Sequence, residues 1–297
     1  MEVDPSTADG ASMNDDESES PLKYAEATLG RPELTFRVSP KRFRAKLLIG
    51  TSLLVYGVIG NALAWQWGLW NVDHITLLVL FAPPLTGLSI LRQLFAARGS
   101  TILIYSNGLL RVQRRDAIGL PWADLRELYL KAEQVGWTVE RDSFGHVTGV
   151  NVLVTAPSVR LDKASLTLTR TDDVEIVLNA TLESYPELVQ EIFLRSFPTL
   201  FARLWDELND VQTEGVEPKR AFGPWQAGVS GLTVDDREIP WARIEGFLVA
   251  NKLLSVFHRR KGKDEHVVIA LESIPNLHLL IALHAAMQPA PSEPPAQ

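Results

Sequence analysis

Catalytic and metal-binding residue patterns are scarce in this sequence. Six histidines are present, none of them in an H-E-x-x-H pattern, and cysteine is absent. The absence of cysteine excludes a thiolate zinc site, a disulfide and a cysteine nucleophile. The segment 261–263, Lys-Gly-Lys, lacks the earlier glycine and the following Ser or Thr of a phosphate-binding loop, and no G-x-S-x-G occurs. We therefore predict that the protein is not an enzyme and carries no metal and no cofactor.

Two of the histidines, His278 and His284, fall in one predicted helix. They are six residues apart and so do not share a helix face. This spacing does not suit a metal, and we predict that both lie on polar surface.

The one charge cluster with a chemical use is a basic run at the predicted tip of a β-hairpin. Its candidate membrane-surface contacts are Arg259, Arg260, Lys261 and Lys263. Close to an anionic leaflet each base contributes ~1 kcal/mol of attraction. The alternative is a solvated turn, because two acidic residues follow the cluster directly.

Net charge is concentrated at one end of the 297-residue chain. The chain has 29 basic and 36 acidic residues, and residues 1–30 hold eight of the acids and one of the bases. The net charge of the leader is therefore −7. The rest of the chain, with 28 acidic and 28 basic residues, is neutral. This balance excludes a basic nucleic-acid-binding protein. The leader, 1–30, and the Pro-rich tail, 288–297, have few large apolar residues and are predicted to be disordered.

Two apolar segments predict a transmembrane hairpin with helices at about 47–69 and 75–95. The stretch 47–72 holds 26 consecutive uncharged residues, and 75–91 holds another 17. About 20 helical residues at ~1.5 Å each cross a ~30 Å hydrocarbon layer. A pair of buried core helices is the alternative, but such a long uncharged run exceeds what a soluble core needs. Pro83-Pro84 predicts a kink in the second helix.

Basic residues flank the inner ends of this hairpin and are missing from its loop. The flanking bases are Lys41, Arg42, Arg44, Lys46, Arg92 and Arg98. Because basic residues stay on the cytoplasmic side, we expect a multi-pass protein of the inner or plasma membrane with both termini in the cytoplasm. The small residues Gly57, Gly60 and Ala64 are expected to pack against the second span.

After residue 99 the apolar period changes from helical to alternating, which predicts short β-strands. In 166–169, for example, leucines and threonines alternate, as in a half-buried antiparallel strand. A helix is predicted from about residue 183, with Pro198 ending it and a second apolar helical segment at 200–208. The first-unit strands are predicted at 101–105, 109–113, 125–130, 136–140, 150–155, 165–169 and 174–178.

A repeated motif divides this region into two similar units. Asn107-Gly108-Leu109 is followed by Leu-Pro-Trp-Ala-Asp-Leu at 120–125, and Ser230-Gly231-Leu232 by Ile-Pro-Trp-Ala-Arg-Ile at 239–244. A duplicated structural unit explains the pattern, and chance convergence on one hairpin is the alternative. The Asn107-Gly108 pair predicts a hairpin turn with positive φ, and the tryptophans, Trp122 and Trp241, are predicted to be core residues.

This arrangement resembles bacterial pleckstrin-homology-like proteins. It is most similar to an uncharacterised bacterial membrane family with a two-span hairpin ahead of such domains. The resemblance implies a repeated β-roll closed by a C-terminal helix, and it brings no enzyme activity or cofactor. The domains expected after the leader are a basic juxtamembrane segment (31–46), the hairpin (47–98), pleckstrin-like unit 1 (99–212) and a shorter unit 2 (213–287). Unit 2 is either partial or completes a joint barrel with unit 1.

The predicted fold is therefore a two-helix membrane hairpin joined to an α+β cytoplasmic region. The expected function is a membrane-anchored, non-enzymatic binding or scaffold protein whose partners are the lipid bilayer and a protein or the inner membrane surface. The alternative is an accessory subunit of a membrane transport or envelope-stress complex.

Overall fold

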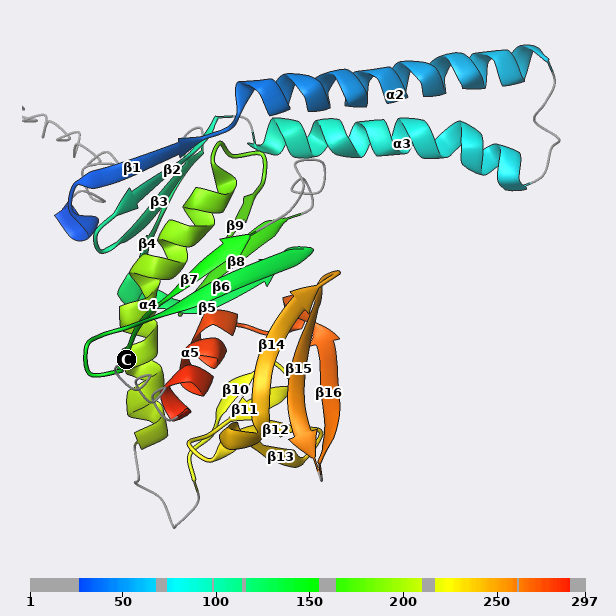
Figure 1. The fold of residues 1–297 in the computed structure, drawn as a ribbon. Helices are drawn as coiled ribbons and strands as arrows, with labels where there is room; N and C mark the ends of the chain where they lie inside the picture. The colour runs from blue at the N-terminus through cyan, green and yellow to red at the C-terminus, as the bar shows by residue number, and fades with distance from the viewer. Residues whose placement is uncertain are drawn as a thin grey trace, which may run out of the picture.

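Figure 1 shows the computed structural model, in which a β-rich body carries two long helices that project from one end. The structure describes residues 27–67, 74–97, 99–113, 116–154, 164–209, 217–260 and 262–288. The body combines antiparallel sheets with packed helices, so the α+β class predicted from the sequence is confirmed. The predicted disorder of the leader and of the tail falls almost wholly outside the described residues.

The first sheet contains four antiparallel strands that pair in chain order. They are β1 (Pro32–Arg37), β2 (Ser100–Tyr105), β3 (Gly108–Gln113) and β4 (Asp116–Pro121). β1 and β2 are neighbours in the sheet, although both long helices separate them in the chain. The hairpin of helices is thus inserted into a β-hairpin. Sequence reasoning missed β1 because its pairing partner lies far away in the chain and its own apolar pattern, Leu34 and Phe36, is short.

The two long helices are α2 (Pro40–Gln66) and α3 (His74–Ala97). At the start of α2 the Ser39 side chain accepts a hydrogen bond from the Arg42 amide, and Pro40 occupies the first turn, where no backbone donor is needed. α2 is long and apolar enough to cross a membrane. The core helix of a soluble protein can meet the same two criteria of length and composition. Only 17% of its most apolar window is buried in the protein.

α2 and α3 pack closely through small residues. Gly50, Gly57 and Ala64, seven residues apart, are the buried positions of α2. A Cβ added to Gly57 would lie 2.5 Å from Cδ of Pro84, so only glycine allows this approach. Of the three small residues predicted to pack against the second helix, Gly57 and Ala64 are buried, whereas Gly60 is half-buried. Contact with α3 is therefore confirmed, with Gly50 as a member that the sequence analysis missed.

A second, three-stranded sheet and a helix follow. They are β5 (Leu125–Lys131), β8 (Ser165–Arg170), β9 (Glu175–Asn179) and α4 (Tyr185–Asn209). The break predicted at Pro198 is wrong, because α4 continues through this residue. A proline inside a helix costs about 3 kcal/mol. The buried apolar face of α4, which includes Phe197 and Leu200 next to the proline, offsets that cost through packing.

The same order of elements then recurs. Four strands pair in chain order: β10 (Arg220–Phe222), β11 (Trp225–Ala227), β12 (Gly231–Val234) and β13 (Arg237–Pro240). Three strands and a helix follow: β14 (Ile244–Ala250), β15 (Leu253–Arg260), β16 (Lys263–Ala270) and α5 (Leu277–Met287). We call β1–β5, β8, β9 and α4 the first unit, and β10–β16 and α5 the second unit. Each unit has four strands, three strands and a closing helix.

The repeated Gly-Leu motif has the same structural role in both units. A Cβ on Gly108 would lie 2.5 Å from the Leu120 carbonyl oxygen, and a Cβ on Gly231 would lie 2.4 Å from that of Ile239. Glycine is therefore required for close strand approach. The predicted reason for Asn107-Gly108, a positive φ, is wrong, because neither residue has one. The hairpin itself is present, since β2 and β3 pair across this turn.

The two repeated tryptophans are also equivalent. Each begins a short 3-10 helix, η2 (Trp122–Asp124) or η4 (Trp241–Arg243), that joins the two sheets of its unit. The indole Nε1 of Trp122 donates to the Ser106 carbonyl at 3.1 Å, and that of Trp241 donates to the Gly228 carbonyl at 2.9 Å. Both side chains are 3% exposed, which confirms the prediction that they are core residues.

A β-hairpin of the first half of the chain extends the second unit. It consists of β6 (Gln134–Arg141) and β7 (Val147–Val154), inserted between β5 and β8. β6 pairs with β14, which produces a five-stranded sheet in the order β16-β15-β14-β6-β7. The hairpin inserted in the first unit therefore joins the sheet of the second unit.

Asn276 makes a second connection between the units. Its Oδ1 accepts from the Leu128 amide at 3.0 Å, its Nδ2 donates to the Arg126 carbonyl at 3.2 Å, and its own amide donates to the Leu128 carbonyl at 2.8 Å. The residue is buried and has a left-handed φ of 53°, which asparagine tolerates better than most residues. The turn before α5 is thus bound to β5.

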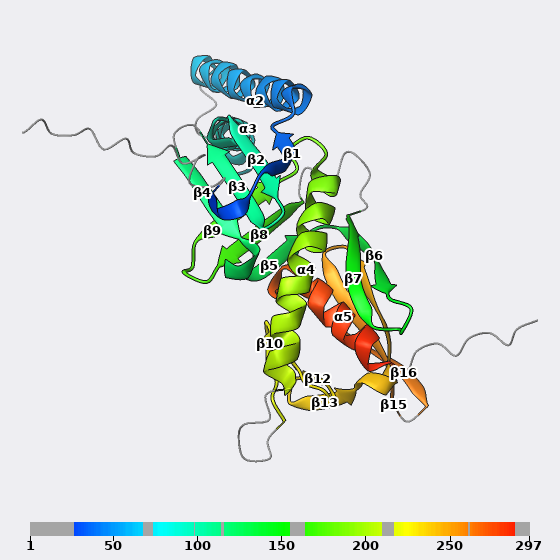
Figure 2. The same cartoon turned by 90° about the vertical axis from the view of Figure 1, so that its left-hand side faces the viewer.

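α5 lies beside α4 in the middle of the body (Figure 2). The polar-surface prediction for His278 is wrong, because this α5 residue is fully buried. Its ring is 4.7 Å from that of Phe193, and neither ring nitrogen hydrogen-bonds to any described residue. Burial lowers its pKa to about 3, so the ring is neutral. Apolar residues occupy all sides of α5, so the sequence pattern shows no separate polar face and does not indicate that His278 is buried.

Candidate functional site

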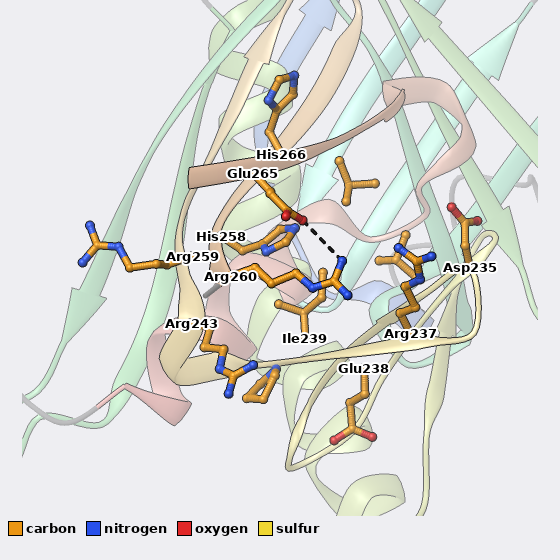
Figure 3. Close-up of a pocket in the computed structure, with 13 residues that line it drawn as sticks. Asp235, Arg237, Glu238, Ile239, Arg243, His258, Arg259, Arg260, Glu265 and His266 are labelled. Atoms are coloured by element: carbon orange, nitrogen blue, oxygen red, sulfur yellow. Dashed lines mark ion pairs between the residues drawn. The ribbon is translucent and has the colours of Figure 1, made fainter. Parts of the chain in front are cut away.

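A cavity lined by charged side chains lies in the second unit, between the β12–β13 hairpin and the β15–β16 hairpin. Its volume is about 700 Å³, and charged side chains from both hairpins surround it (Figure 3). We call this cavity the arginine cleft. Its charged and histidine lining residues are Asp235, Arg237, Glu238, Arg243, His258, Arg259, Arg260, Glu265 and His266.

Two local features form the cleft. Asp235 and Asp236 both have positive φ, 47° and 61°, so the two-residue turn that they form brings Arg237 back opposite Val234. On β15, Leu254 and Val256 point into the core, and alternation places His258 on the same inner face. His258 is thus buried in the cleft wall.

Four arginines and three carboxylates line the cleft, and several are already paired. Arg260 lies 3.7 Å from Glu265, and Arg259 lies 2.9 Å from Glu245. Within the described ranges no carboxylate is within 4 Å of Arg237 or Arg243. Two guanidinium groups therefore remain without an ion pair there.

Figure 3 shows how the side chains are directed. Those of Arg237, Arg260 and His258 point to the middle of the cleft, whereas Arg259 and Glu238 point away from it. Guanidinium groups bind phosphate and carboxylate groups in a bidentate manner, and they keep their charge at all physiological pH values. The cleft is therefore suited to an anionic ligand.

The first unit has an equivalent corner, and the strand register identifies it. Leu125, at the start of β5, pairs with Arg170, just as Ile244, at the start of β14, pairs with His258. Arg170 and His258 therefore occupy equivalent positions.

In the first unit this corner is closed. Arg170 donates from Nη1 to the Gly119 carbonyl at 3.0 Å, and from Nε to Asp172 at 2.7 Å, so it joins β8 to β4. This hydrogen bond from Arg170 is the main reason that the pKa of Asp172 falls to about 2. His258 makes no such connection to β13 among the described residues. The corner is therefore bridged by a side-chain hydrogen bond in the first unit, whereas in the second unit the cleft occupies the equivalent place.

The residues predicted from the sequence lie partly in the cleft. Arg259 and Arg260 line it, Lys263 pairs with Arg260 in the strand register without lining it, and Lys261 lies outside the described residues. Sequence reasoning missed Arg237 and Arg243, and it placed His258 at the start of the basic run without counting it as a contact. Comparison of the repeats would have identified Arg243, because it replaces Asp124 in an otherwise matching Trp-Ala-x segment.

The predicted juxtamembrane bases are at the base of the helical hairpin. Lys41, Arg42, Arg44 and Lys46 lie in the first two turns of α2, and Arg92 lies in α3. Arg98 is outside the described residues. The Arg42 guanidinium donates to the Ala180 carbonyl, so one of these bases holds the hairpin against the body.

No group of three or more His, Asp and Glu side chains in the described part of the chain could hold a metal ion.

Fold and cleft together define an α+β protein that has two similar units, a projecting helical hairpin and one cleft suited to anions. The chain belongs to DUF6585, a family of unknown function whose model matches residues 17–291. Comparison with curated proteins gives no match.

Proposed function

We propose that this chain is a membrane-anchored, non-enzymatic binding protein, with α2 and α3 inserted in the membrane. The observation that carries the proposal is the exposed apolar surface of α2. Eight large apolar side chains of this helix are 40–76% exposed: Leu48, Ile49, Val55, Tyr56, Val58, Ile59, Leu63 and Trp65. The helices project away from the body (Figure 1), and an apolar surface of this size is costly in water.

The bases at one end of the hairpin set its orientation. Lys41 and Lys46 precede the apolar stretch of α2, and Arg92 follows that of α3. Because the β-rich body lies at this same end, the body and both termini are cytoplasmic. The protein is thus a multi-pass protein of the inner or plasma membrane.

The body supports the pleckstrin-homology-like assignment. Each unit has a four-stranded sheet, then three further antiparallel strands and a closing helix, which is the order expected for such a β-roll. We infer that the chain resembles bacterial membrane proteins in which such domains follow a two-span hairpin. The first unit carries the anchor, and the second carries the binding site.

The arginine cleft binds an anionic group of the inner membrane surface. Arg237 and Arg243 lie in it without a carboxylate partner among the described residues, and the cleft is wide enough for a phosphate-bearing head group. Membrane anchoring keeps the cleft near such groups, so weak individual contacts are sufficient.

Carbonate extraction of membranes tests the anchor. At alkaline pH an inserted protein stays with the bilayer, whereas a protein held by surface charge is released. We expect the full chain to remain in the membrane pellet, and release into the supernatant would refute the anchor.

Hydrogen exchange tests the cleft. The full chain is compared in nanodiscs of phosphatidylcholine alone and in nanodiscs that also contain phosphatidylglycerol. The anionic lipid should slow exchange in residues 234–243, and the double variant Arg237→Gln/Arg243→Gln should lose this protection. Equal exchange in both lipids would exclude the head-group site while leaving the anchor intact.

A second candidate function is an accessory subunit of a membrane transport or envelope-stress complex. It is favoured by the outer face of the five-stranded sheet, where large apolar side chains are 38–50% exposed: Leu153, Leu248, Leu253, Phe257 and Val268. Such a face suits a partner protein. Crosslinking in intact membranes should then recover one partner in stoichiometric amount, and recovery of the uncrosslinked chain alone would exclude this function.

A further inference from the structure

The five-stranded sheet of the second unit has one face in the core and one outer face. On β15, Leu254 and Val256 are fully buried, whereas the alternate residues Leu253 and Phe257 are exposed on the opposite side. The strand register places three more exposed apolar side chains on that side: Leu153, Leu248 and Val268. We call this side the outer sheet face.

The first unit contains an equivalent face, with which the outer sheet face can be compared. The matching register at Leu125 and Ile244 aligns β5, β8 and β9 with β14, β15 and β16. Inner positions are apolar in both units. Leu168 of β8, for example, corresponds to Val256 of β15, and both are buried.

The outer positions differ between the two units. The charged outer residues of β5 and β9 are Glu127, Lys131 and Glu175. Their counterparts in the second unit are Gly246, Ala250 and His266. Similarly, Ser165 and Thr169 correspond to Leu253 and Phe257. Because the same strands form in the first unit with a polar outer side, the fold does not require the apolar one, which indicates a contact outside the unit.

Charge on the outer sheet face is confined to its rim. In the described strands β14, β15 and β16, the outer positions between Leu253 and Phe257 and those paired with them hold no Lys, Arg, Asp or Glu. At the rim, Arg259 lies 2.9 Å from Glu245 and 3.5 Å from Asp264, so its charge is balanced. An anionic membrane surface attracts clustered bases, which this face lacks. An apolar centre with a charged rim is typical of a protein interface.

Large and small side chains alternate on this face around Ser255. Leu248 and Val268 both pair with Ser255, and on β15 itself Ser255 lies between Leu253 and Phe257. The serine is therefore a hollow surrounded by four large apolar side chains. Two such faces can interdigitate at the ~10 Å spacing of packed sheets.

The outer sheet face has about the size of one half of a dimer interface. Five strands at ~4.8 Å spacing, with about seven residues at ~3.3 Å each, give a plan area on the order of 500 Å². A standard interface buries about 800 Å² of accessible surface per partner. Because the accessible surface of side chains exceeds the plan area, the two sizes are close.

The direction of the strands allows two copies to meet through this face. Figure 1 shows β14, β15 and β16 side by side, with their strands running across the direction of α2 and α3. Neither face of the sheet therefore points along the hairpin. A two-fold axis parallel to the hairpin brings two outer sheet faces together with their strands antiparallel and both hairpins directed the same way.

We propose that the outer sheet face is a homodimer interface, in which Ser255 lies opposite Ser255 of a second copy. A second copy fits because two identical faces match in size, in their uncharged centre and in their alternation of large and small side chains. This interface is separate from the arginine cleft and depends on the fold of the second unit, not on insertion of the hairpin. In an inserted protein, the shared membrane raises the local concentration of the second copy.

Light scattering after size-exclusion chromatography of the full chain, in mild detergent without added lipid, tests the inference. Wild type should be a dimer. Ser255→Arg and Ser255→Asp each place two like charges together in an apolar interface, so each variant alone should be monomeric. We expect the dimer dissociation constant to rise at least about a hundredfold. An equal mixture of the two variants should restore a dimer, because opposite charges then meet. Native mass spectrometry identifies that heterodimer by its mass.

Thr167→Arg is the matched control, because Thr167 is the equivalent outer position of the first unit. It should remain dimeric, and all three variants should unfold in denaturant as the wild type does. A monomeric wild type would overturn the inference and leave the face to a different protein or to lipid. The inference also fails if Ser255→Arg is as dimeric as the control, or if the mixture of variants stays monomeric.

Discussion

Gly57 of α2 lies so close to Pro84 of α3 that a Cβ on the glycine would come within 2.5 Å of the proline ring. The two helices of the hairpin are therefore in contact at backbone distance near their middle. A Cβ added to Gly50 would similarly lie 2.9 Å from Cγ of Leu91. The hairpin is thus a packed unit in its own right, which agrees with its projection from the body (Figure 1).

Gly57→Leu should separate the two helices. The larger side chain has no space beside Pro84, and overpacking of this kind costs about 2 kcal/mol. The thermal unfolding midpoint of the full chain in detergent should fall. Ala62→Leu is the control, because Ala62 is exposed on the same helix and should have no effect. Equal midpoints for the two variants would show that the close contact is not formed.

Gly108→Ala and Gly231→Ala should destabilise the protein to a similar extent. In each case the added methyl group meets a carbonyl oxygen at 2.5 Å or less, so the neighbouring strand must move, at a cost of about 2 kcal/mol. Chemical denaturation of the full chain measures the change. Gly246→Ala should be harmless, because its Cβ meets no atom within 4 Å. A large effect at only one of the repeated glycines would contradict their equivalence.

Asn276→Ala should weaken the connection between the units. The variant leaves the buried Leu128 amide without its side-chain acceptor and puts alanine at a left-handed φ, which together cost about 3 kcal/mol. Asn276→Gly loses the same hydrogen bonds without the backbone strain, so it should be about 1 kcal/mol more stable than the alanine variant. Denaturation curves of both variants that match the wild type would show that β5 does not depend on this residue.

His278 should make the protein less stable in acid. Its pKa is about 3 in the folded protein against an ordinary 6.5, so below pH 6.5 the unfolded chain binds a proton that the folded chain does not. Stability from this group is complete above pH 6.5 and is lost as the pH falls, by about 3 kcal/mol at pH 4.

His278→Leu isolates this effect, because leucine does not titrate. The variant should be at least as stable as the wild type at pH 7, where it removes two ring nitrogens that have no hydrogen-bond partner among the described residues. Its unfolding free energy should also change less between pH 7 and pH 4. A wild type and variant with parallel pH profiles would contradict the buried, neutral state.

Local patterns in the sequence predicted much of the fold. The alternation of leucine and threonine in 166–169 identifies β8, and the repeated Pro-Trp motif identifies two equivalent junctions between sheets. The strand pairings that local patterns did not reveal are those between segments far apart in the chain. β1 pairs with a strand beyond two long helices, and β6 joins the sheet of the other unit through Val249 and Ala250.

The candidate site was only partly predictable for the same reason. Arg259 and Arg260 stand out because they are consecutive bases in a hairpin. Arg237 is isolated in the sequence and reaches the cleft through the turn at Asp235 and Asp236.

Reporter fusions test the central claim, the insertion of the hairpin with the body on the cytoplasmic side. One reporter that is active only outside the membrane and one that is active only in the cytoplasm are fused after residue 72 and after residue 297. We predict activity of the external reporter at 72 and of the cytoplasmic reporter at 297. Cytoplasmic activity at both positions, or external activity at 297, would contradict the account.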